Sequence, residues 1–302
     1  SCNIFCNGNM TDPLTYHLRF TPEELDKQYN LRTGRPDYET TVISRWMSDS
    51  EMARKILKSR LDIRYGKGEN QKLDVFTCGD ILAPTLVYFH GGYWQRGDKS
   101  IYSFLAKPFN ETGVNVVVVG YDLCPIVTIT EISEEAREAI AYIWENSGEL
   151  GINANRINAM GHSAGGHITQ MMMGTIWSNF CSKLPKDLIK SAISISPLSY
   201  LEPVRLTQAL NSGIRMDKVE AQSESPITNY PPVTNASQLV IVGGGETTEF
   251  HRQAGIYVDA FATSDRKIEL FIVPEVDHFD EINVLVDPSS NLFKRIIALL
   301  KS

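Results

Sequence analysis

The amino-acid sequence predicts an α/β fold built on a mostly parallel sheet of eight strands with helices on both faces. Short apolar segments alternate with amphipathic helical segments along most of the chain, which is the order of strand–helix–strand units in a parallel sheet. Residues 116–119 are four consecutive valines, a run that is typical of a strand buried on both faces. Right-handed crossovers between such strands place helices on both sides of the sheet.

Each element is predicted from a local pattern. A first helix begins after Thr21, because this hydroxyl cap is followed by proline and, three residues on, by Glu24. A second helix covers about 43–58. Alternating residues at 61–65 and 73–76 predict an antiparallel pair at the sheet edge. Apolar runs predict further strands near 85–89, 115–120, 156–160, 191–195, 238–242 and 268–273. Helical periodicity predicts further helices near 98–110, 132–146, 164–177, 249–262 and 291–301.

The chain is long enough for these elements to share one core. At 302 residues one large α/β domain can bury a full core, and residues 21–302 are expected to form it. Residues 1–20 show little pattern and are expected to be a poorly ordered extension. Residues 197–235 lack a clear strand and contain several prolines, which predicts an insertion near the edge of the sheet that carries the candidate catalytic residues.

Composition excludes several classes of function. The net charge of −7 gives no basic surface for nucleic acid, and the longest apolar stretch, near 114–119, is too short to cross a bilayer. No charged-then-apolar leader opens the chain, so no signal peptide is expected. The cysteines are odd in number and form no C-x-x-C pair, which favours a reduced, cytoplasmic protein without a zinc site. They are Cys2, Cys6, Cys78, Cys124 and Cys181.

The most informative motif surrounds Ser163. Residues 161–165 read Gly-His-Ser-Ala-Gly and lie between a predicted strand and a predicted helix. In such a G-x-S-x-G turn, only small side chains fit two residues before and after the serine, and the hydroxyl stands exposed above the sheet. Ser163 is therefore the candidate nucleophile, and the N–H of Ala164 points to whatever the hydroxyl attacks.

A second motif follows the predicted strand 85–89. Residues 90–94 read His-Gly-Gly-Tyr-Trp, and a glycine pair at a strand end lets backbone N–H groups face a ligand. In esterases with a G-x-S-x-G turn, such a loop supplies the second half of an oxyanion hole. The predicted oxyanion hole consists of Gly91, Gly92, Tyr93 and Ala164.

The candidate base is His278. Of the six histidines in the chain, it alone lies in the loop after the last predicted strand, where the histidine of a Ser–acid–His hydrolase is expected. The candidate acid is Glu246, the first carboxylate after the preceding strand. Glu249 is a weaker alternative because it is expected to open the next helix, and Asp277 adjoins the histidine too closely in sequence to orient it. Glutamate can hold the imidazole tautomer as aspartate does.

These residues carry a family resemblance. Residues 90–94, residues 161–166, His278 and the Tyr-Asp-Leu-Cys-Pro stretch at 121–125 resemble the hormone-sensitive-lipase-like branch of the α/β hydrolases. Tyr-Trp after the glycine pair, together with Glu-Thr-Thr-Glu-Phe-His-Arg-Gln at 246–253, resembles the kynurenine formamidase (arylformamidase) family more narrowly. The resemblance covers about residues 20–300 and implies an α/β-hydrolase fold with a small cap. The family pattern has aspartate at the position of Glu246.

The resemblance implies hydrolysis of N-formyl-L-kynurenine to L-kynurenine and formate in tryptophan breakdown, without a metal or another cofactor. Ser163 would attack the formyl carbon while His278 takes its proton, and water would then clear a formyl-enzyme. A formyl group needs only a small acyl pocket, which bulky Tyr93 and Trp94 would close. The aromatic leaving group needs a slot with stacking contacts. Candidate substrate contacts are Tyr93, Trp94, Tyr200 and Tyr230.

Two other functions use the same sequence features. A carboxylesterase of broad specificity would apply the same machinery to short acyl esters. A non-catalytic binding protein with a hydrolase fold is the other alternative, although such proteins typically lose the serine, the histidine or the elbow glycines, and this chain keeps all of them. A small-molecule substrate is expected, with neither nucleic acid nor membrane as a partner. The oligomeric state is left open, with a homodimer as one option.

Overall fold

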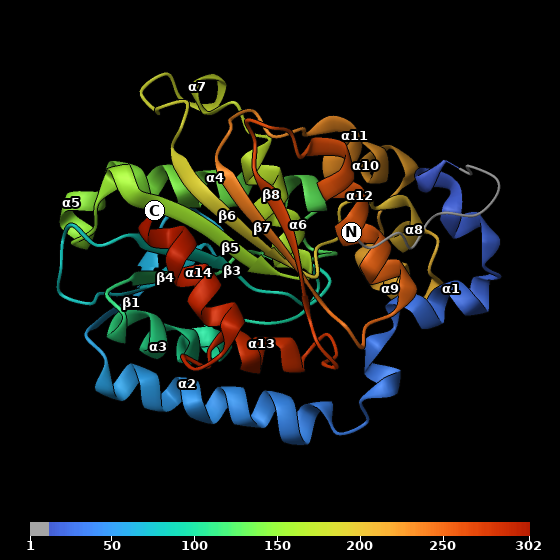
Figure 1. Cartoon of the computed structure of the whole chain (residues 1–302), viewed down its shortest axis with the longest axis horizontal. Coiled ribbons are helices and arrows are strands. Elements are labelled where there is room, and N and C mark those ends of the chain that lie inside the picture. Colours follow the sequence, from blue (N-terminus) through green and yellow to red (C-terminus); the bar gives the residue numbers. More distant parts are fainter. Residues whose placement is uncertain (1–11) are drawn as a thin grey trace.

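The computed structural model describes residues 12–302, which are built around one eight-stranded sheet (Figure 1). The strand order is β1-β2-β4-β3-β5-β6-β7-β8. The strands are β1 (Ser59–Arg64), β2 (Lys72–Phe76), β3 (Thr85–Phe89), β4 (Asn115–Val119), β5 (Ile157–His162), β6 (Ile189–Ile195), β7 (Ser237–Gly243) and β8 (Ile268–Val273). Strands β3 to β8 pair in parallel, whereas β2 pairs antiparallel with both β1 and β4. The predicted sheet and its antiparallel edge pair are confirmed.

Helices cover both faces of the sheet, as the sequence predicts. One face packs against α4 (Ile129–Glu145), α6 (Ala164–Met173) and α12 (Thr248–Phe261), and the other against α2 (Ser44–Ile56), α3 (Ala106–Glu111) and α14 (Asn291–Lys301). The valines of β4 divide between the two cores, because successive side chains of a strand point to opposite faces. Val117 and Val119 belong to the first core, and Val116 and Val118 to the second. In Figure 1, α2 and α3 lie below the sheet.

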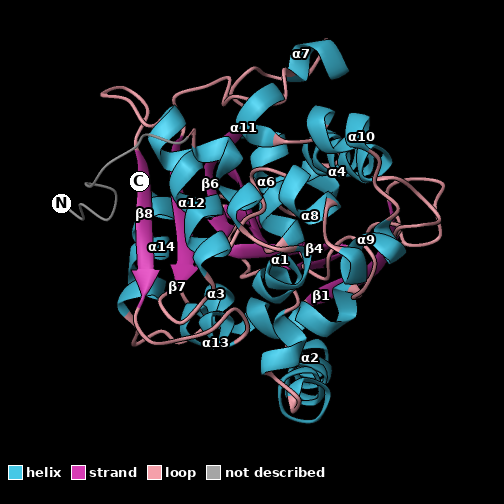
Figure 2. Ribbon diagram, turned by 90° about the vertical axis from the view of Figure 1, so that its right-hand side faces the viewer, coloured by secondary structure: helices cyan, strands magenta, loops and turns pink. Residues whose placement is uncertain are grey.

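The remaining helices are short and connect these layers. They are α1 (Pro22–Tyr29), α5 (Ser147–Leu150), α7 (Trp177–Phe180), α8 (Glu202–Arg205), α9 (Gln208–Ile214), α10 (Lys218–Ser223), α11 (Pro226–Asn229) and α13 (Asp280–Leu285). Segments of 3₁₀-helix form η1 (Pro13–Arg19), η2 (Leu31–Gly34), η4 (Lys99–Leu105) and η5 (Ala154–Arg156), and η3 (Tyr38–Ile43) is a π-helix. Helices α1, α8 and α9 gather at one end of the molecule (Figure 2).

Several boundaries differ from the sequence prediction. The helix expected at 98–110 is the 3₁₀ segment η4 followed by α3, and the helix expected at 164–177 ends at Met173, where Gly174 caps it. Helix α13 was not predicted. The start of α1 is confirmed, with Thr21 and Glu24 exchanging the two hydrogen bonds of a capping box.

The N-terminal segment and the predicted insertion both differ from a plain loop. Residues 1–11 lie outside the described residues. Pro13–Arg19 form η1, in which His17 is buried. Residues 197–235 contain the four short helices α8 to α11. In the described part of the chain, no helix has both the length and the apolar character needed to cross a membrane.

Candidate active site

Ser163 occupies a strained turn between β5 and α6. Its backbone angles are φ 59° and ψ −115°, a conformation that costs energy for a residue with a side chain. The turn is held by the Ser163 N–H, which donates to the Ile195 carbonyl at 2.7 Å. A Cβ atom at Gly165 would overlap the Phe89 carbonyl oxygen, and one at Gly161 would overlap the Gly165 carbonyl oxygen. Glycine is therefore required two residues before and two residues after Ser163, because a larger side chain would overlap the backbone at either position.

The loop after β3 lies directly against this turn. A Cβ atom at Gly91 would come within 2.9 Å of the His162 carbonyl oxygen and 3.2 Å of Ser163 Cβ, so only glycine lets the loop approach this closely. Gly92 has φ 118° and faces the Arg96 carbonyl, which leaves no room for a side chain. The loop therefore brings backbone groups, rather than side chains, next to the candidate nucleophile.

His90 braces the base of this loop. Its ring is stacked on the ring of Tyr121, with centroids 4.3 Å apart, and lies parallel to the ring of Tyr102 on a longer contact of 5.7 Å. The Tyr121 hydroxyl donates to the His90 carbonyl at 2.6 Å. Burial lowers the pKa of His90, which keeps this imidazole neutral and suited to a structural role.

Glu246 and His278 form a buried acid–base pair. The Nδ1–H of His278 donates to Glu246 Oε2 at 2.7 Å, an arrangement that leaves Nε2 as the basic nitrogen in the neutral form of the ring. Glu246 Oε1 accepts the Gly243 N–H at 2.9 Å and the Ser196 hydroxyl. Burial acts to raise the pKa of the Glu246 carboxyl, but the charge of His278 and three hydrogen-bond donors hold that pKa below its usual value.

The other two carboxylates considered from the sequence are occupied elsewhere. Glu249 forms a buried ion pair with Arg252, at 2.6 Å, and accepts the Tyr29 hydroxyl at 2.6 Å. Asp277 pairs with Arg35 at 2.7 Å. Among the described residues, Glu246 is the carboxylate that accepts the hydrogen bond of His278.

Ser163 and His278 line one small cavity, of about 120 Å³. Gly91, Gly92 and Tyr93 line it as well, so most of the residues predicted from the two glycine motifs and the last loop meet here. Among the described residues, no hydrogen bond joins the Ser163 hydroxyl to His278. The remaining lining residues are Tyr29, Asn30, Leu31, Arg32, Tyr38, Trp46, Arg96, Tyr102, His162, Ala209, Leu210 and Phe279.

Three predicted substrate contacts do not line this cavity. Trp94 is fully buried in the core, and its indole N–H donates to Nδ1 of His167 at 3.2 Å. Tyr200 exchanges backbone hydrogen bonds with the Gln253 side chain. Tyr230 packs beneath the Arg137 guanidinium, 5.5 Å from its ring centre. Of the four candidates only Tyr93 reaches the cavity, and its hydroxyl donates to the Tyr29 carbonyl at 2.6 Å.

A second buried carboxylate, Glu281, was missed in the sequence. Its Oε1 lies 2.7 Å from the Ser196 hydroxyl oxygen, whose single hydrogen can be donated either to Glu281 or to Glu246. Burial and the neighbouring Glu246 raise the pKa of Glu281 well above its usual value, which favours the neutral form of this carboxyl group. In the sequence, Glu281 is marked only by its position three residues after His278. That position does not distinguish a buried carboxyl group from an exposed one on a helix.

The N-terminal lining residues were also missed. Asn30, Arg32 and Tyr38 reach the cavity from the segment between α1 and α2. This segment carries no recognised motif, and its contact with residues more than 120 positions later depends on the tertiary fold.

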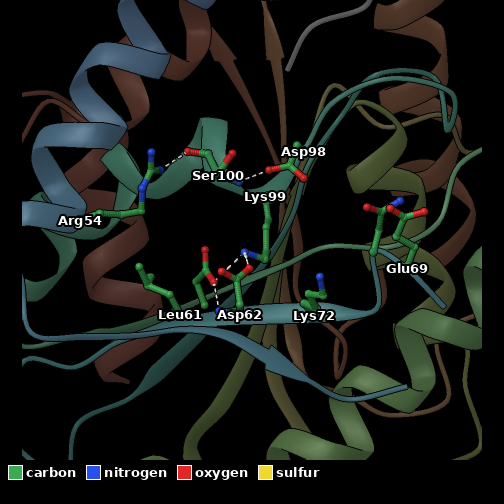
Figure 3. Close-up of a pocket in the computed structure, with 10 residues that line it drawn as sticks. Arg54, Leu61, Asp62, Glu69, Lys72, Asp98, Lys99 and Ser100 are labelled. Carbon is green, nitrogen blue, oxygen red and sulfur yellow. Dashed lines mark hydrogen bonds and ion pairs between the residues drawn. The ribbon is translucent and has the colours of Figure 1, made fainter. Parts of the chain in front are cut away.

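A larger cavity, of about 310 Å³, lies away from these residues, between the β1–β2 edge and η4 (Figure 3). Its charged groups are largely paired with each other. Lys99 Nζ lies 2.8 Å from Asp62 and 2.7 Å from Asp74. Because this cavity lacks a nucleophile–base pair, the candidate active site is the smaller cavity.

One group of side chains has the composition of a metal site. Within the described residues, ligand atoms of His162, His278 and Glu281 all lie within 4.8 Å of one another. One nitrogen atom of each histidine is engaged, however. His162 Nε2 donates to the His278 carbonyl at 2.8 Å, and His278 Nδ1 is bound to Glu246. A metal ion bound through these two nitrogen atoms would have to displace both hydrogen bonds.

Comparison with known sequences identifies relatives along nearly the whole chain. The family model described as BD-FAE matches residues 74–198, which include both glycine motifs. A kynurenine formamidase of Salmo salar is 30% identical over 92% of this chain and 96% of its own length. A kynurenine formamidase of Danio rerio gives the same identity and the same coverage.

Solved structures of other proteins share the fold of this chain along most of its length. A crystal structure of a Silicibacter sp. tm1040 protein described as a thioesterase candidate is 32% identical, with a TM-score of 0.77 over 92% of this chain and 99% of that one. An esterase of Pyrobaculum calidifontis is 19% identical, with a TM-score of 0.66 over 93% and 96%. The second likeness concerns the fold alone, which is that of the α/β hydrolases.

Proposed function

The chain belongs to the kynurenine formamidase family of α/β hydrolases, and we propose that it hydrolyses N-formyl-L-kynurenine to L-kynurenine and formate. The observation that carries this proposal is the acid–base pair of Glu246 and His278 in the cavity that Ser163 lines. The chemistry required is attack on a formamide carbon by a hydroxyl with a base beside it, and the cavity holds both groups.

We propose that Ser163 and His278 carry out the acylation step. The Ser163 hydroxyl attacks the formyl carbon while His278 Nε2 takes its proton, and Glu246 stabilises the imidazolium through Nδ1–H. Glu246 already orients the base for this step. The hydrogen bond between Ser163 and His278 is expected to form when substrate binds, because such bonds are often long before substrate enters this type of site. His278 then gives the proton to the arylamine, and L-kynurenine leaves.

The oxyanion is proposed to bind to backbone N–H groups. Among residues 12–302, the N–H groups of Gly92, Tyr93 and Ala164 donate to no other protein group. Ala164 is the first residue of α6, where helix geometry leaves N–H groups without an internal partner. Three free donors around Ser163 are suited to the charge that develops on the formyl oxygen. Gly91 contributes by its close approach, which brings the loop to the serine.

Deacylation reuses the same base. Water attacks the formyl ester on Ser163 while His278 takes its proton, and formate leaves as Ser163 recovers its hydrogen. Each step therefore needs only groups that line the cavity or support them, and the proposed mechanism contains no metal or other cofactor.

The substrate assignment is tested by comparing two substrates. Purified protein is assayed with N-formyl-L-kynurenine, following kynurenine by absorbance and formate by a coupled enzyme, and with phenyl acetate as a short aryl ester. We expect equimolar kynurenine and formate and a higher kcat/KM for the formamide. A higher kcat/KM for the ester, with little kynurenine released, would instead identify a carboxylesterase.

We further propose that the enzyme acts in the cytoplasm as a single domain over residues 21–302. The three described cysteines, Cys78, Cys124 and Cys181, are all free thiols, as is usual in a reducing compartment. A homodimer remains a proposal, to be checked by light scattering of the purified protein.

A further inference from the structure

The candidate active site has two arginines in its lining, although the protein carries a net negative charge. Arg32 and Arg96 line it together with Ser163, and among residues 12–302 no aspartate or glutamate belongs to its lining. The whole chain, in contrast, carries a net charge of −7. A local excess of positive charge at a cavity favours an anionic ligand group.

The two arginines differ in how far they are already engaged. The Arg32 guanidinium is 3.0 Å from Glu39 Oε1 and stacks 4.2 Å from the centre of the Tyr38 ring. For Arg96, by contrast, no ion pair or side-chain hydrogen bond is present within residues 12–302. The charge of Arg96 reaches Tyr38 in the cavity lining. Burial raises the pKa of Tyr38, and the positive charges of Arg32 and, to a lesser extent, Arg96 act to lower it. Of the two arginines in the described lining, Arg96 is therefore the one available to a ligand.

The position of Arg96 is fixed relative to the reacting centre. Its backbone N–H donates to the Gly92 carbonyl at 3.0 Å, which closes a turn inside the candidate oxyanion loop. Gly92 packs so closely against the Arg96 carbonyl that a side chain at Gly92 would overlap it. The guanidinium thus projects from the same rigid loop that would hold the formyl oxygen.

We propose that Arg96 binds a carboxylate on the leaving-group side of the substrate, so that the enzyme selects N-formyl arylamines with an anionic tail. This inference rests on the proposed function, whose substrate carries an α-carboxylate. The guanidinium offers paired N–H donors that match a carboxylate. The aromatic residues Tyr38, Tyr102 and Phe279 line the same cavity and suit the aryl ring between the formyl group and the tail.

The test compares Arg96→Gln with the unaltered enzyme on three formamides. N-formyl-L-kynurenine carries both the ammonium and the carboxylate, N-formylkynuramine carries the ammonium alone, and N-(2-acetylphenyl)formamide carries neither. We expect Arg96→Gln to raise KM for N-formyl-L-kynurenine about 10-fold or more, as for loss of a charge-assisted hydrogen bond. For the other two substrates kcat/KM should change less than about twofold. Arg96 is exposed, so the variant is expected to fold.

A control variant and a binding measurement distinguish a role of Arg96 in carboxylate binding from a general loss of activity. Arg32→Gln removes the engaged arginine and should raise KM for N-formyl-L-kynurenine less than Arg96→Gln does. L-Kynurenine binding, measured by calorimetry, should weaken in Arg96→Gln by a similar factor to KM. Equal losses on all three formamides, or unchanged binding of L-kynurenine, would overturn the role of Arg96 while leaving the proposed function intact. Failure of the unaltered enzyme on every formamide would overturn both.

Discussion

Replacing Glu246 by glutamine should reverse the tautomer of His278. The two carboxylate oxygens have different surroundings, because Oε1 accepts the Gly243 N–H at 2.9 Å and Oε2 accepts the His278 Nδ1–H at 2.7 Å. A glutamine can satisfy Gly243 only by placing its carbonyl oxygen at the Oε1 position. Its NH₂ group then faces His278 and donates to Nδ1, which moves the imidazole proton to Nε2 and removes the base.

The magnitude follows from the hydrogen bonds around the amide. The opposite orientation leaves the fixed Gly243 N–H facing an NH₂ group, at a cost of about 1–3 kcal/mol. The unproductive orientation should therefore predominate by about 5- to 150-fold. With the stabilisation of the imidazolium lost as well, we expect kcat to fall about 10³- to 10⁴-fold, as in other triads with this change. This corresponds to about 4–5 kcal/mol in the activation free energy.

The assay measures kcat and KM of Glu246→Gln and Glu246→Asp with N-formyl-L-kynurenine. We expect near-normal KM for both variants and much higher activity in Glu246→Asp, which keeps a carboxylate. Circular dichroism and thermal unfolding confirm that each variant is folded. A folded Glu246→Gln enzyme that keeps more than about a tenth of kcat would refute the tautomer argument.

The remaining predictions concern stability, pH and labelling. Trp94→Ala should lower the free energy of unfolding by about 3–5 kcal/mol without widening acyl selectivity, since Trp94 packs in the core; a gain in activity on butyryl esters would show that it is a pocket wall. Glu249→Gln should cost about 3 kcal/mol in urea unfolding, because it leaves Arg252 unpaired in the interior, yet leave kcat of the folded fraction unchanged; a stability equal to that of the unaltered protein would contradict this. The pKa of Glu281 is raised on folding, so the unaltered protein loses stability as pH rises above the usual glutamate range. Glu281→Gln lacks this titration, so its melting temperature should rise relative to that of the unaltered protein between pH 5 and pH 8. A difference that stays constant over this range would contradict the raised pKa. A fluorophosphonate should label Ser163 alone, and a chelator should leave activity intact; loss on chelation would point to a functional metal ion.

The fold could be predicted well because its signals are local. Consecutive valines in β4, alternation in β1 and β2 and the capping box at Thr21 each depend on residues that are neighbours in sequence. The turn at Ser163 and the loop at Gly91 could be located for the same reason, since steric crowding permits only glycine at fixed offsets.

The lining of the cavity could not be predicted in the same way. Trp94 follows Tyr93 directly, yet both have positive φ, 57° and 50°, and this backbone turns the indole into the core while Tyr93 stays at the cavity. Arg32 reaches the site from a segment without a motif, through long-range packing of α1 and η2. A sequence pattern shows which residue types are adjacent, but not which way an irregular loop turns them.

Formate release by Ser163→Ala tests the central claim most directly. The claim is that this serine attacks the formyl group of N-formyl-L-kynurenine, so formate and kynurenine are measured together for the unaltered enzyme and the variant at equal folded concentration. We predict equimolar products from the unaltered enzyme and a kcat lowered about 10³-fold or more in Ser163→Ala, the residual rate coming from the oxyanion hole and substrate binding. Undiminished release of both products by the variant would contradict the mechanism.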